Sequence, residues 1–517
     1  MLPQTKNTDI MIKHILSAAL LFLISVSYAQ PGTLDGTYAD GAEIKNLNFL
    51  PSDEEWMTHS IVDAQDRTWI AGTTLQDGDW SILLVRLTPD GNYDDTFAGT
   101  GHAAINVSLG NIEYVNGLTL QDNGLIIAGH IIEDGTPNPF ALKYTADGGL
   151  DTDFGDSGIT VVPANMIATN VTTDNDSNVY ISGVSEDNVI VAKLLPDGSL
   201  DSEFGFFGAA FADFPSTDQS TALDVDNNGN VFVFGYGELN GTTRGQITSF
   251  TTTGEINTNF TGNGRKSITW PDEKIFHVSQ GFLNDAGDEF YLVGYAEDPE
   301  TENKNTAMVA VGIDSEQNMT FAGDGWFEVD LAIGGNDQAT NMIESEAGLY
   351  IASNVQELPT GINSVVLHTT TNGEMVEEFG NLGIGTFNIV ASGEDQALGL
   401  SSQSDGRLIL TGIALAQEIG VYGYAARIET SIITGINDKH PLTDFSIYPN
   451  PAVNYIWVAQ EESSEITRNY RIYGNNGQLL LQGVLNSSKQ RLDISSLPPG
   501  MYQVIIGNQF KKLIKFK

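Results

Sequence analysis

The stretch Thr145–Gly158, TADGGLDTDFGDSG, returns along this chain about every 57 residues. Five further copies end at Gly101, Gly208, Gly264, Gly325 and Gly383 and share the skeleton D-G-x-L-D-x-x-F-G-x-x-G, and a degenerate seventh copy, PGTLDGTYADG, occupies Pro31–Gly41. Their aromatic positions, spaced 50 to 61 residues apart, are Tyr38, Phe97, Phe154, Phe204, Phe260, Phe321 and Phe379. Such a regular period predicts a repeat fold.

A second motif keeps the same period. It consists of a polar turn, an alternating apolar strand and a small residue, as in NGLIIAG at Asn123–Gly129. The motif ends at Gly72, Gly129, Gly183, Gly235, Gly294, Ser353 and Gly412. Turn formers followed by period-two hydrophobic residues are typical of a hairpin strand with one half-buried face. A short apolar run then precedes each D-G turn, so each unit is predicted to contain three or four short antiparallel strands.

The residues inside the first motif have readable structural roles. Asp147-Gly148 suits a turn that needs positive φ, and Leu150 and Phe154 are spaced to bury their side chains. Asp151 is expected to accept hydrogen bonds from its own turn, as aspartates do in Asx-turns. We interpret all of these positions as structural.

The two ends of the array complement each other. The chain opens with a motif tail at Leu34–Tyr38 that has no preceding strands, whereas the last unit, with Asp405–Gly412 and Tyr424–Ile428, has no tail. Joining them would complete one blade and leave only short, protected edges. The prediction is an all-β fold: a seven-bladed β-propeller over residues 30–430, closed by the N-terminal strand. A solenoid would need polar caps, and none is evident.

On these motifs, residues 31–430 resemble the delta-60 repeat family of bacterial exported proteins. The resemblance rests on L-D-x-x-F-G-x-x-G after an apolar strand and a D-G turn. It implies a β-propeller and no single biochemical activity.

The N-terminus has the pattern of a secretory signal peptide. Over residues 1–29, Lys6 and Lys13 precede the apolar run Ile15–Val26, and Ser27-Tyr28-Ala29 offers small residues for cleavage. The run is short for a membrane span, and no later segment reaches spanning length. We therefore expect export by the Sec machinery, with translation starting at Met1 or Met11. The chain has no cysteine, so its stability must come from packing.

The C-terminal segment has a different pattern. Residues 431–440 read as a linker, and residues 441–517 hold short alternating runs that predict a small immunoglobulin-like β-sandwich. This segment resembles the type A C-terminal sorting domain of the type IX secretion system of Bacteroidetes. The matching motif residues are Tyr448, Pro449, Asn450, Pro451, Gly500, Tyr502, Lys511, Lys512, Lys515 and Lys517. The resemblance implies passage from the periplasm through the type IX translocon, followed by release or anchoring at the outer cell surface.

The formal net charge of −44 limits the partners of the protein. Residues from Asp438 onward are slightly basic, so the acidity lies in the repeat region. Binding a phosphate backbone or an anionic membrane requires clustered Lys and Arg, which this region lacks. We therefore expect neither nucleic acid nor anionic lipid as a partner.

Several catalytic or metal-like patterns have a simpler explanation. Gly155-Asp156-Ser157-Gly158 has the letters found around a serine-protease nucleophile, but it occupies the repeat position of Gly205-Phe206-Phe207-Gly208. DVDNNG at Asp224–Gly229 imitates the start of a calcium loop and coincides with a hairpin turn, as do Asp174, Asp176 and Asn178. Calcium at these turns is a weak alternative, and otherwise we predict no cofactor, no metal and no catalytic residues. The histidines, among them His59, His130, His277 and His368, show no metal-ligand spacing.

The sequence leaves three hypotheses for function. The leading one is a non-enzymatic, secreted or surface-displayed propeller with a binding face for a glycan, a peptide or a protein. The alternative is a polysaccharide hydrolase or lyase with carboxylates in the central channel. The third is a passive surface-layer component. Five tryptophans could line a sugar-binding face, although core packing is the commoner role for this residue, and they are Trp56, Trp69, Trp80, Trp270 and Trp326.

Overall fold

The structure, a computed structural model, is an all-β protein. It describes residues 30–49, 54–76, 79–108, 111–122, 124–214, 216–239, 241–332, 335–357, 361–390, 393–416, 420–430, 445–450, 452–460, 468–474, 479–485, 487, 489–498, 500–506 and 509–516. The helical elements in these ranges are three short 3-10 turns, η1 (Tyr38–Gly41), η2 (Pro271–Glu273) and η3 (Phe321–Gly323). The predicted signal peptide and linker, and the motif residues Pro451 and Lys517, lie outside the described residues.

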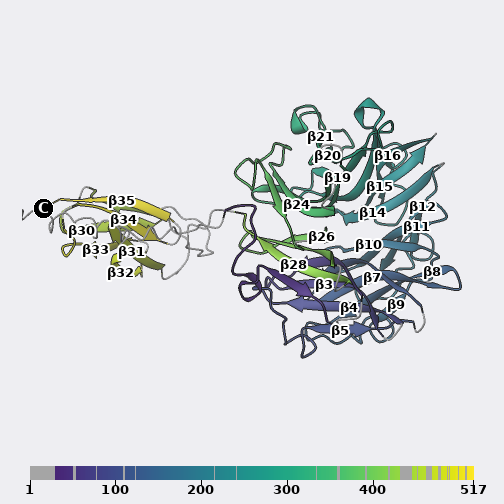
Figure 1. The fold of residues 1–517 in the computed structure, drawn as a ribbon, viewed down its shortest axis with the longest axis horizontal. Coiled ribbons are helices and arrows are strands. Elements are labelled where there is room, and N and C mark those ends of the chain that lie inside the picture. The colour runs from purple at the N-terminus through teal and green to yellow at the C-terminus, as the bar shows by residue number, and fades with distance from the viewer. Residues whose placement is uncertain are drawn as a thin grey trace, which may run out of the picture.

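Seven four-stranded antiparallel sheets form the blades of the propeller. Blades 1 to 3 contain β2 (Glu55–Val62), β3 (Thr68–Gln76), β4 (Asp79–Leu87) and β5 (His102–Ile105); β6 (Glu113–Gln121), β7 (Gly124–Glu133), β8 (Thr136–Tyr144) and β9 (Ile159–Val161); and β10 (Ile167–Thr173), β11 (Val179–Ser185), β12 (Asn188–Leu194) and β13 (Ala209–Ala212). Blades 4 to 6 contain β14 (Thr217–Val225), β15 (Val231–Leu239), β16 (Thr242–Phe250) and β17 (Arg265–Ile268); β18 (Ile275–Leu283), β19 (Glu289–Glu297), β20 (Lys304–Gly312) and β21 (Phe327–Val329); and β22 (Asp337–Ser345), β23 (Gly348–Glu357), β24 (Gly361–Thr369) and β25 (Ile384–Phe387). In Figure 1 the sheets follow one another in chain order round the domain, from purple through teal to green.

Blade 7 closes the ring by joining the two ends of the array, which confirms the predicted seven-bladed propeller. Its sheet has the order β1-β28-β27-β26. It consists of β1 (Ile44–Leu47), β26 (Glu394–Ser402), β27 (Leu408–Ala416) and β28 (Gly420–Ile428), and β1 pairs with β28. The motif tail at Leu34–Tyr38, which indicated the closure, precedes this outer strand. That segment forms an isolated bridge, Leu34 to Ile428, whereas the regular outer strand is Ile44–Leu47. The motif tail therefore leads into the closing strand, as it does in every other blade.

Each inner strand carries a β-bulge at the same place. The bulge comes directly after the inner-strand residue that pairs with the small-residue position of the neighbouring strand; in blade 4 it falls between Ser220 and Ala222. Ser220 pairs there with Gly235, and a Cβ added to Gly235 would lie 1.8 Å from the carbonyl oxygen of Gln219. The recurring glycine is thus required by a close approach of two backbones. In blade 6 the position is Ser353, whose hydroxyl lies 2.6 Å from that of Thr306 in blade 5.

The repeated aromatic residues form joints between neighbouring blades. All seven are buried. In blade 2, for example, Phe154 contacts the D-G turn of blade 3 at Gly198, and the next residue, Gly155, donates its N–H to the carbonyl of Asp197 at 2.7 Å. Ring closure uses the same joint, because Gly380 donates to the carbonyl of Pro31 at 2.8 Å. The opening motif therefore specifies how one blade meets the next.

The motif aspartate also makes an ion pair that sequence analysis did not predict. In four blades it faces a cation on the third strand, and the pairs are Asp94–Arg86, Asp151–Lys143, Asp201–Lys193 and Asp35–Arg427. In blades where the aspartate is replaced the cation is replaced too, and the corresponding pairs are Asn257–Ser249, Asn318–Ala310 and Val376–His368. Losing both charges together avoids leaving one ion unpaired in a poorly solvated site.

The ion pair of blade 7 belongs to a buried network. Asp35 lies 2.7 Å from Arg427 and 2.6 Å from Arg407. Burial acts to raise the pKa of Asp35, but hydrogen bonds from Thr37 and the charge of Arg427 bring that pKa below its ordinary value. The carboxyl of Glu429 is buried beside them, and its burial together with the charge of Asp35 raises its pKa to about 6.

We expect Glu429→Gln to stabilise the protein at pH 8 and to have less than half of that effect at pH 5. Because the pKa of Glu429 is raised in the folded state, the folded state holds this proton more tightly than the unfolded state does. The resulting stability is fully present below the ordinary pKa of 4.5 and is lost as the pH rises through about 6. Removing the ionisable group should therefore raise the free energy of unfolding at pH 8 by about 2 kcal/mol. Urea unfolding of the wild type and the variant at both pH values measures the difference. An equal change in the free energy of unfolding at pH 5 and pH 8 would contradict the raised pKa of Glu429.

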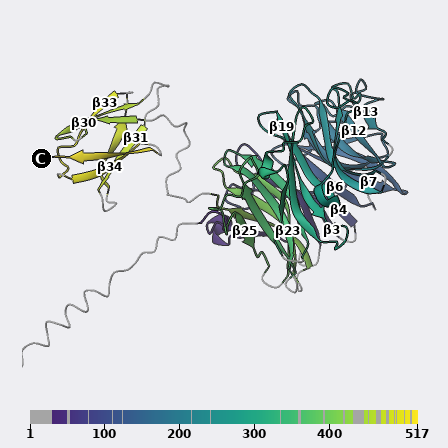
Figure 2. The ribbon, with the colours of Figure 1, turned by 90° about the horizontal axis from the view of Figure 1, so that it is seen from above.

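The C-terminal domain is a two-sheet sandwich, as predicted (Figure 2). One sheet contains β29 (Phe445–Tyr448), β30 (Tyr455–Gln460) and β33 (Lys489–Asp493), and the other contains β32 (Leu479–Leu485), β31 (Arg468–Gly474), β34 (Gly500–Ile506) and β35 (Gln509–Lys515). The motif residue Asn450 accepts the N–H of Ile514 at 2.8 Å, and Tyr502 donates its hydroxyl proton to the carbonyl of Pro498. Tyr448 is partly exposed beside the Lys489 ammonium, and Lys515 is buried. The remaining motif positions, Gly500, Lys511 and Lys512, lie on β34 and β35.

Candidate binding site between blades 1 and 2

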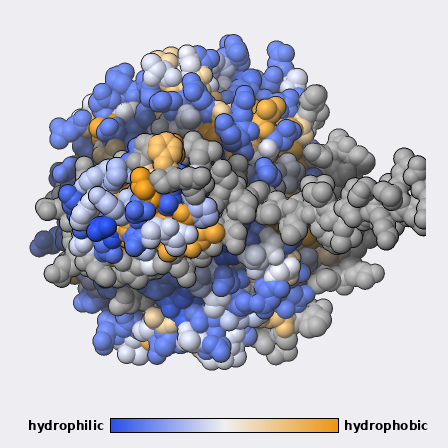
Figure 3. Space-filling view, turned by 90° about the vertical axis from the view of Figure 1, so that its left-hand side faces the viewer, coloured by the Kyte–Doolittle hydropathy of each residue, from blue (hydrophilic) through white to orange (hydrophobic). Residues whose placement is uncertain are grey.

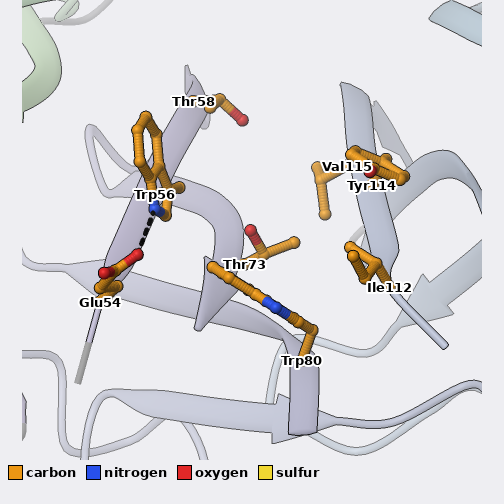
Figure 4. Close-up of a pocket in the computed structure, with 8 residues that line it drawn as sticks. All are labelled: Glu54, Trp56, Thr58, Thr73, Trp80, Ile112, Tyr114 and Val115. Carbon is orange, nitrogen blue, oxygen red and sulfur yellow. Dashed lines mark hydrogen bonds between the residues drawn. The ribbon is translucent and has the colours of Figure 1, made fainter. Parts of the chain in front are cut away.

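A crevice of about 360 Å³ opens between the first two blades, where their inner strands begin (Figure 4). It is lined by Glu54, Trp56, Thr58, Thr73, Trp80, Ile112, Tyr114 and Val115. Figure 4 shows the two tryptophans on the blade 1 side and Ile112, Tyr114 and Val115 on the blade 2 side. The lining is mainly apolar with a few polar groups, which is the usual composition of a small-molecule site.

Strand register directs both tryptophans into this crevice. Trp56 on β2 pairs with Thr73 on β3, and Thr73 pairs with Ile82 on β4. Residues paired across a sheet share one face, and so do residues two apart on one strand, so Trp80 lies on the same face as Ile82. Ile82 packs in a core cluster with Val115 of blade 2. Both indole rings therefore face the next blade.

Three large side chains of the crevice are exposed. Trp56 is 38% exposed, Ile112 40% and Tyr114 41%. The indole N–H of Trp56 donates to Oε2 of Glu54 at 3.4 Å, which fixes one edge of the ring. The ring of Tyr114 stacks on His130 with centroids 4.9 Å apart, and burial lowers the pKa of His130. Neutral His130 therefore supports the tyrosine ring at neutral pH.

The pair of tryptophans departs from the repeat. Trp56 precedes the inner-strand residue that pairs with the recurring glycine, and Trp80 lies three residues before the third-strand partner of the same glycine. In blades 2 to 7 the same two positions hold Tyr114 and Pro137, Ile167 and Asp187, Gln219 and Thr243, His277 and Lys304, Gln338 and Ile362, and Gln396 and Val421. Two aromatic residues thus come together in blade 1 alone. A departure of this kind in an otherwise regular scaffold points to function.

The other tryptophans of the propeller have packing roles. Trp69 is buried, donates its indole N–H to Asp63 at 2.9 Å and lies under the Arg86 guanidinium. Trp270 is buried against Trp326, with ring centroids 4.7 Å apart. Sequence analysis favoured core packing for each tryptophan, and the structure separates Trp56 and Trp80 from that group. Ile112 and Tyr114 were missed, although Tyr114 occupies the repeat position of Trp56.

The central channel holds a second cavity, of about 410 Å³. Its polar lining includes His59, Asn170, Gln280, Asn341 and Glu344. Burial lowers the pKa of His59 to about 4, so its imidazole is neutral at neutral pH. Among the described residues that line this cavity, Glu344 is the one carboxylate.

The calcium-like and serine-protease-like stretches are ordinary turns. Asp226 accepts the N–H groups of Asn228 and Asn230 on Oδ1 and the Asn230 amide on Oδ2, and Asp174 is arranged in the same way. These oxygens therefore serve as hydrogen-bond acceptors for the hairpin. Ser157 sits at φ 57° in an exposed hairpin turn and donates to Asp156. In the described part of the chain no three His, Cys, Asp or Glu residues gather as metal ligands do.

Comparison with known families matches one stretch in each part of the chain. Residues 446–516 match the family described as a secretion system C-terminal sorting domain, and residues 68–97 match a domain of unknown function described as a β-propeller, DUF5122. The chain therefore combines a β-propeller with a type IX sorting domain, and it is exported to the cell surface or beyond by that system. The described residues contain no helix with the length and hydrophobicity needed to cross a membrane.

Three solved structures with similar folds are distant in sequence. Virginiamycin B lyase from Staphylococcus aureus is 12% identical, with 81% of this chain and 95% of that chain covered and a TM-score of 0.32. The β-propeller domain of the Trilobed protease from Pyrococcus furiosus is 8% identical, with coverage of 74% and 99% and a TM-score of 0.41. Sqt1 from Chaetomium thermophilum is 11% identical, with coverage of 75% and 100% and a TM-score of 0.41. No curated protein matches the chain in sequence.

Proposed function

We propose that this exported propeller is a non-enzymatic binding protein that holds a glycan in the crevice between blades 1 and 2. The observation that carries the proposal is the pair of tryptophans, Trp56 and Trp80, directed into one crevice by the strand register. Indole rings present a flat apolar face with a polar edge, which suits the C–H face of a sugar ring. The hydroxyl of Thr73 and the carboxylate of Glu54 offer polar contacts for sugar hydroxyl groups.

The location of the crevice also supports this function. Export by the type IX system brings the protein to the outer surface, where glycans are abundant ligands. Figure 3 shows one face of the molecule on which hydrophilic side chains predominate and apolar ones form small patches. The repeat region carries the acidic excess of the chain, so a partly exposed aromatic crevice in it is a distinct feature.

The enzymatic alternative places hydrolase or lyase chemistry in the central channel. Glycoside hydrolysis usually needs two carboxyl groups about 5 to 10 Å apart. The described lining of the channel offers Glu344 as a carboxylate and His59 as a neutral imidazole. This described lining offers one carboxylate where the reaction usually needs two, so binding without turnover agrees better with it. Polysaccharide cleavage by the purified protein that disappears in Glu344→Gln would favour the enzyme instead.

The test of glycan binding is a comparison of crevice and control variants. We expect the full mature chain to bind one or more members of a panel of soluble bacterial and plant polysaccharides in affinity electrophoresis. Trp56→Ala and Trp80→Ala should each weaken that binding about tenfold or more, because each removes a stacking surface worth roughly 1–2 kcal/mol. Phe207→Ala is the matched control, since Phe207 is an exposed aromatic residue in blade 3. No binding by the wild type, or equal losses in all three variants, would overturn the proposal.

A further inference from the structure

The crevice between blades 1 and 2 has a marked bias in charge. Of its eight lining residues one is a carboxylate, Glu54, and none is a lysine or an arginine. Glu54 is exposed, and its Oε2 lies 3.4 Å from the indole nitrogen of Trp56. The carboxylate is therefore held at the edge of the ring on which a ligand would stack.

Two further carboxylates stand next to crevice residues in the chain but outside the lining of the crevice. Glu55 and Glu113 begin the inner strands of blades 1 and 2, directly beside Glu54 and Tyr114 in the chain, and both are buried. Glu113 accepts the N–H groups of Val107 and Ser108 at 3.0 Å, and Glu55 accepts that of Phe49 at 3.2 Å. These bonds anchor the loops that lead into the two inner strands.

Glu54 gives the edge of the crevice a pure hydrogen-bond acceptor, whereas the hydroxyls of Thr73 and Tyr114 can accept or donate and the Trp80 indole N–H donates. A carboxylate can only accept, and the Trp56 indole N–H is already donated to Glu54. The Thr58 hydroxyl lies 2.8 Å from Nδ1 of His59. A ligand that donates protons, through hydroxyl, amide or ammonium groups, would be matched here. A ligand that brings further carboxylate or sulfate oxygens near Glu54 would meet its negative charge.

We propose that the crevice selects saccharides with neutral or amino-bearing rings and rejects acidic ones. This inference rests on the proposed glycan-binding function and names the ligand class of the same site. Stacking on Trp56 and Trp80 supplies contact area for any sugar ring, whereas Glu54 discriminates by charge. An ammonium group on the ligand gains both from the carboxylate and from the faces of the indole rings. The net charge of −44 acts in the same direction at longer range.

The binding test uses three hexasaccharides, built from glucosamine, from N-acetylglucosamine and from galacturonic acid. At low ionic strength we expect the glucosamine and N-acetylglucosamine hexamers to bind the full mature chain at least tenfold more tightly than the galacturonate hexamer in titration calorimetry. Glu54→Gln should reduce the preference for glucosamine over galacturonate several-fold, and 0.5 M salt should reduce it too, because salt screens exposed charges. Glu377→Gln, which removes an exposed carboxylate in blade 6, is the control and should leave the preference unchanged. Equal or tighter binding of the galacturonate hexamer would overturn the inference while supporting glycan binding.

A ligand-free measurement separates the two proposals. Caesium, iodide and acrylamide quench tryptophan fluorescence as a cation, an anion and a neutral probe. The contribution of Trp56 and Trp80 is the difference between the wild type and the Trp56→Phe/Trp80→Phe variant. We expect caesium to quench this contribution more strongly than iodide, and Glu54→Gln to narrow the gap. Stronger quenching by iodide would overturn the charge selection, even if none of the three hexasaccharides binds. Absence of all glycan binding would refute the proposed function and leave the quenching result intact.

Discussion

Asp35→Asn is expected to lower the free energy of unfolding by about 3–5 kcal/mol, the range measured when one partner of a buried ion pair is removed. The Asp35 carboxylate joins the N-terminal segment to two arginines, with Arg427 at 2.7 Å and Arg407 at 2.6 Å. The side chains of Asp35 and Arg427 are 4% and 2% exposed, so water cannot replace the lost charge. The side-chain oxygen of asparagine would still accept the N–H of Thr37. Its NH2 group would face the guanidinium groups of Arg407 and Arg427, which are also hydrogen-bond donors. Urea unfolding followed by intrinsic fluorescence measures the loss.

Asp151→Asn provides the matched control, because Asp151 occupies the same motif position in blade 2. Its carboxylate is 25% exposed and lies 3.3 Å from the Lys143 ammonium, so solvent screens the pair. We expect a loss below about 1 kcal/mol there. Equal losses at both positions would show that blade closure gains nothing special from the buried network. Since the pKa of Asp35 is lowered, the wild-type advantage should be present at neutral pH and decline as the pH falls through that pKa.

Gly235→Ala is the second substitution with a large expected effect, a loss of about 3 kcal/mol. The added methyl group would lie 1.8 Å from the carbonyl oxygen of Gln219, so two backbones must separate. This contact sits at the bulge of the inner strand, where β14 and β15 of blade 4 pair. The change is measured as the shift in the urea midpoint and the melting temperature.

Gly262→Ala is the control for this substitution. A Cβ at Gly262 would have no atom within 4 Å, and its backbone does not require positive φ. We expect a change within about 0.5 kcal/mol, as for most surface positions. A similar loss at both glycines would contradict the close-approach explanation.

The arrangement of the blades was largely predictable from the chain. The motif of Thr145–Gly158 recurs because each blade must meet the next in the same way, through a buried aromatic residue and a bond to the D-G turn. The missing tail after Ile428 and the surplus tail at Leu34 predicted ring closure for the same reason. The bounds of the closing strand, Ile44–Leu47, were not predicted, because the sequence signal belongs to the motif and not to the short outer strand that follows it.

The binding site was much less predictable. Trp56 and Trp80 look like ordinary hydrophobic positions of two strands, and tryptophan is most often buried. Their exposure depends on lying near the ends of the strands, beyond the packed cluster that contains Ile82 and Val115. Sequence patterns report which residues alternate along a strand, but they do not report where a core ends.

The sequence by itself determined the class of fold, the number of blades, the closure and the export route, because these follow from period, turn chemistry and local motifs. The tertiary structure decided which side chains meet across blades. Asp35 and Arg427 are 392 residues apart in the chain. One wall of the crevice comes from blade 1 and the other from blade 2. Such contacts depend on strand register and on the packing of one blade against the next, and these are properties of the assembled ring.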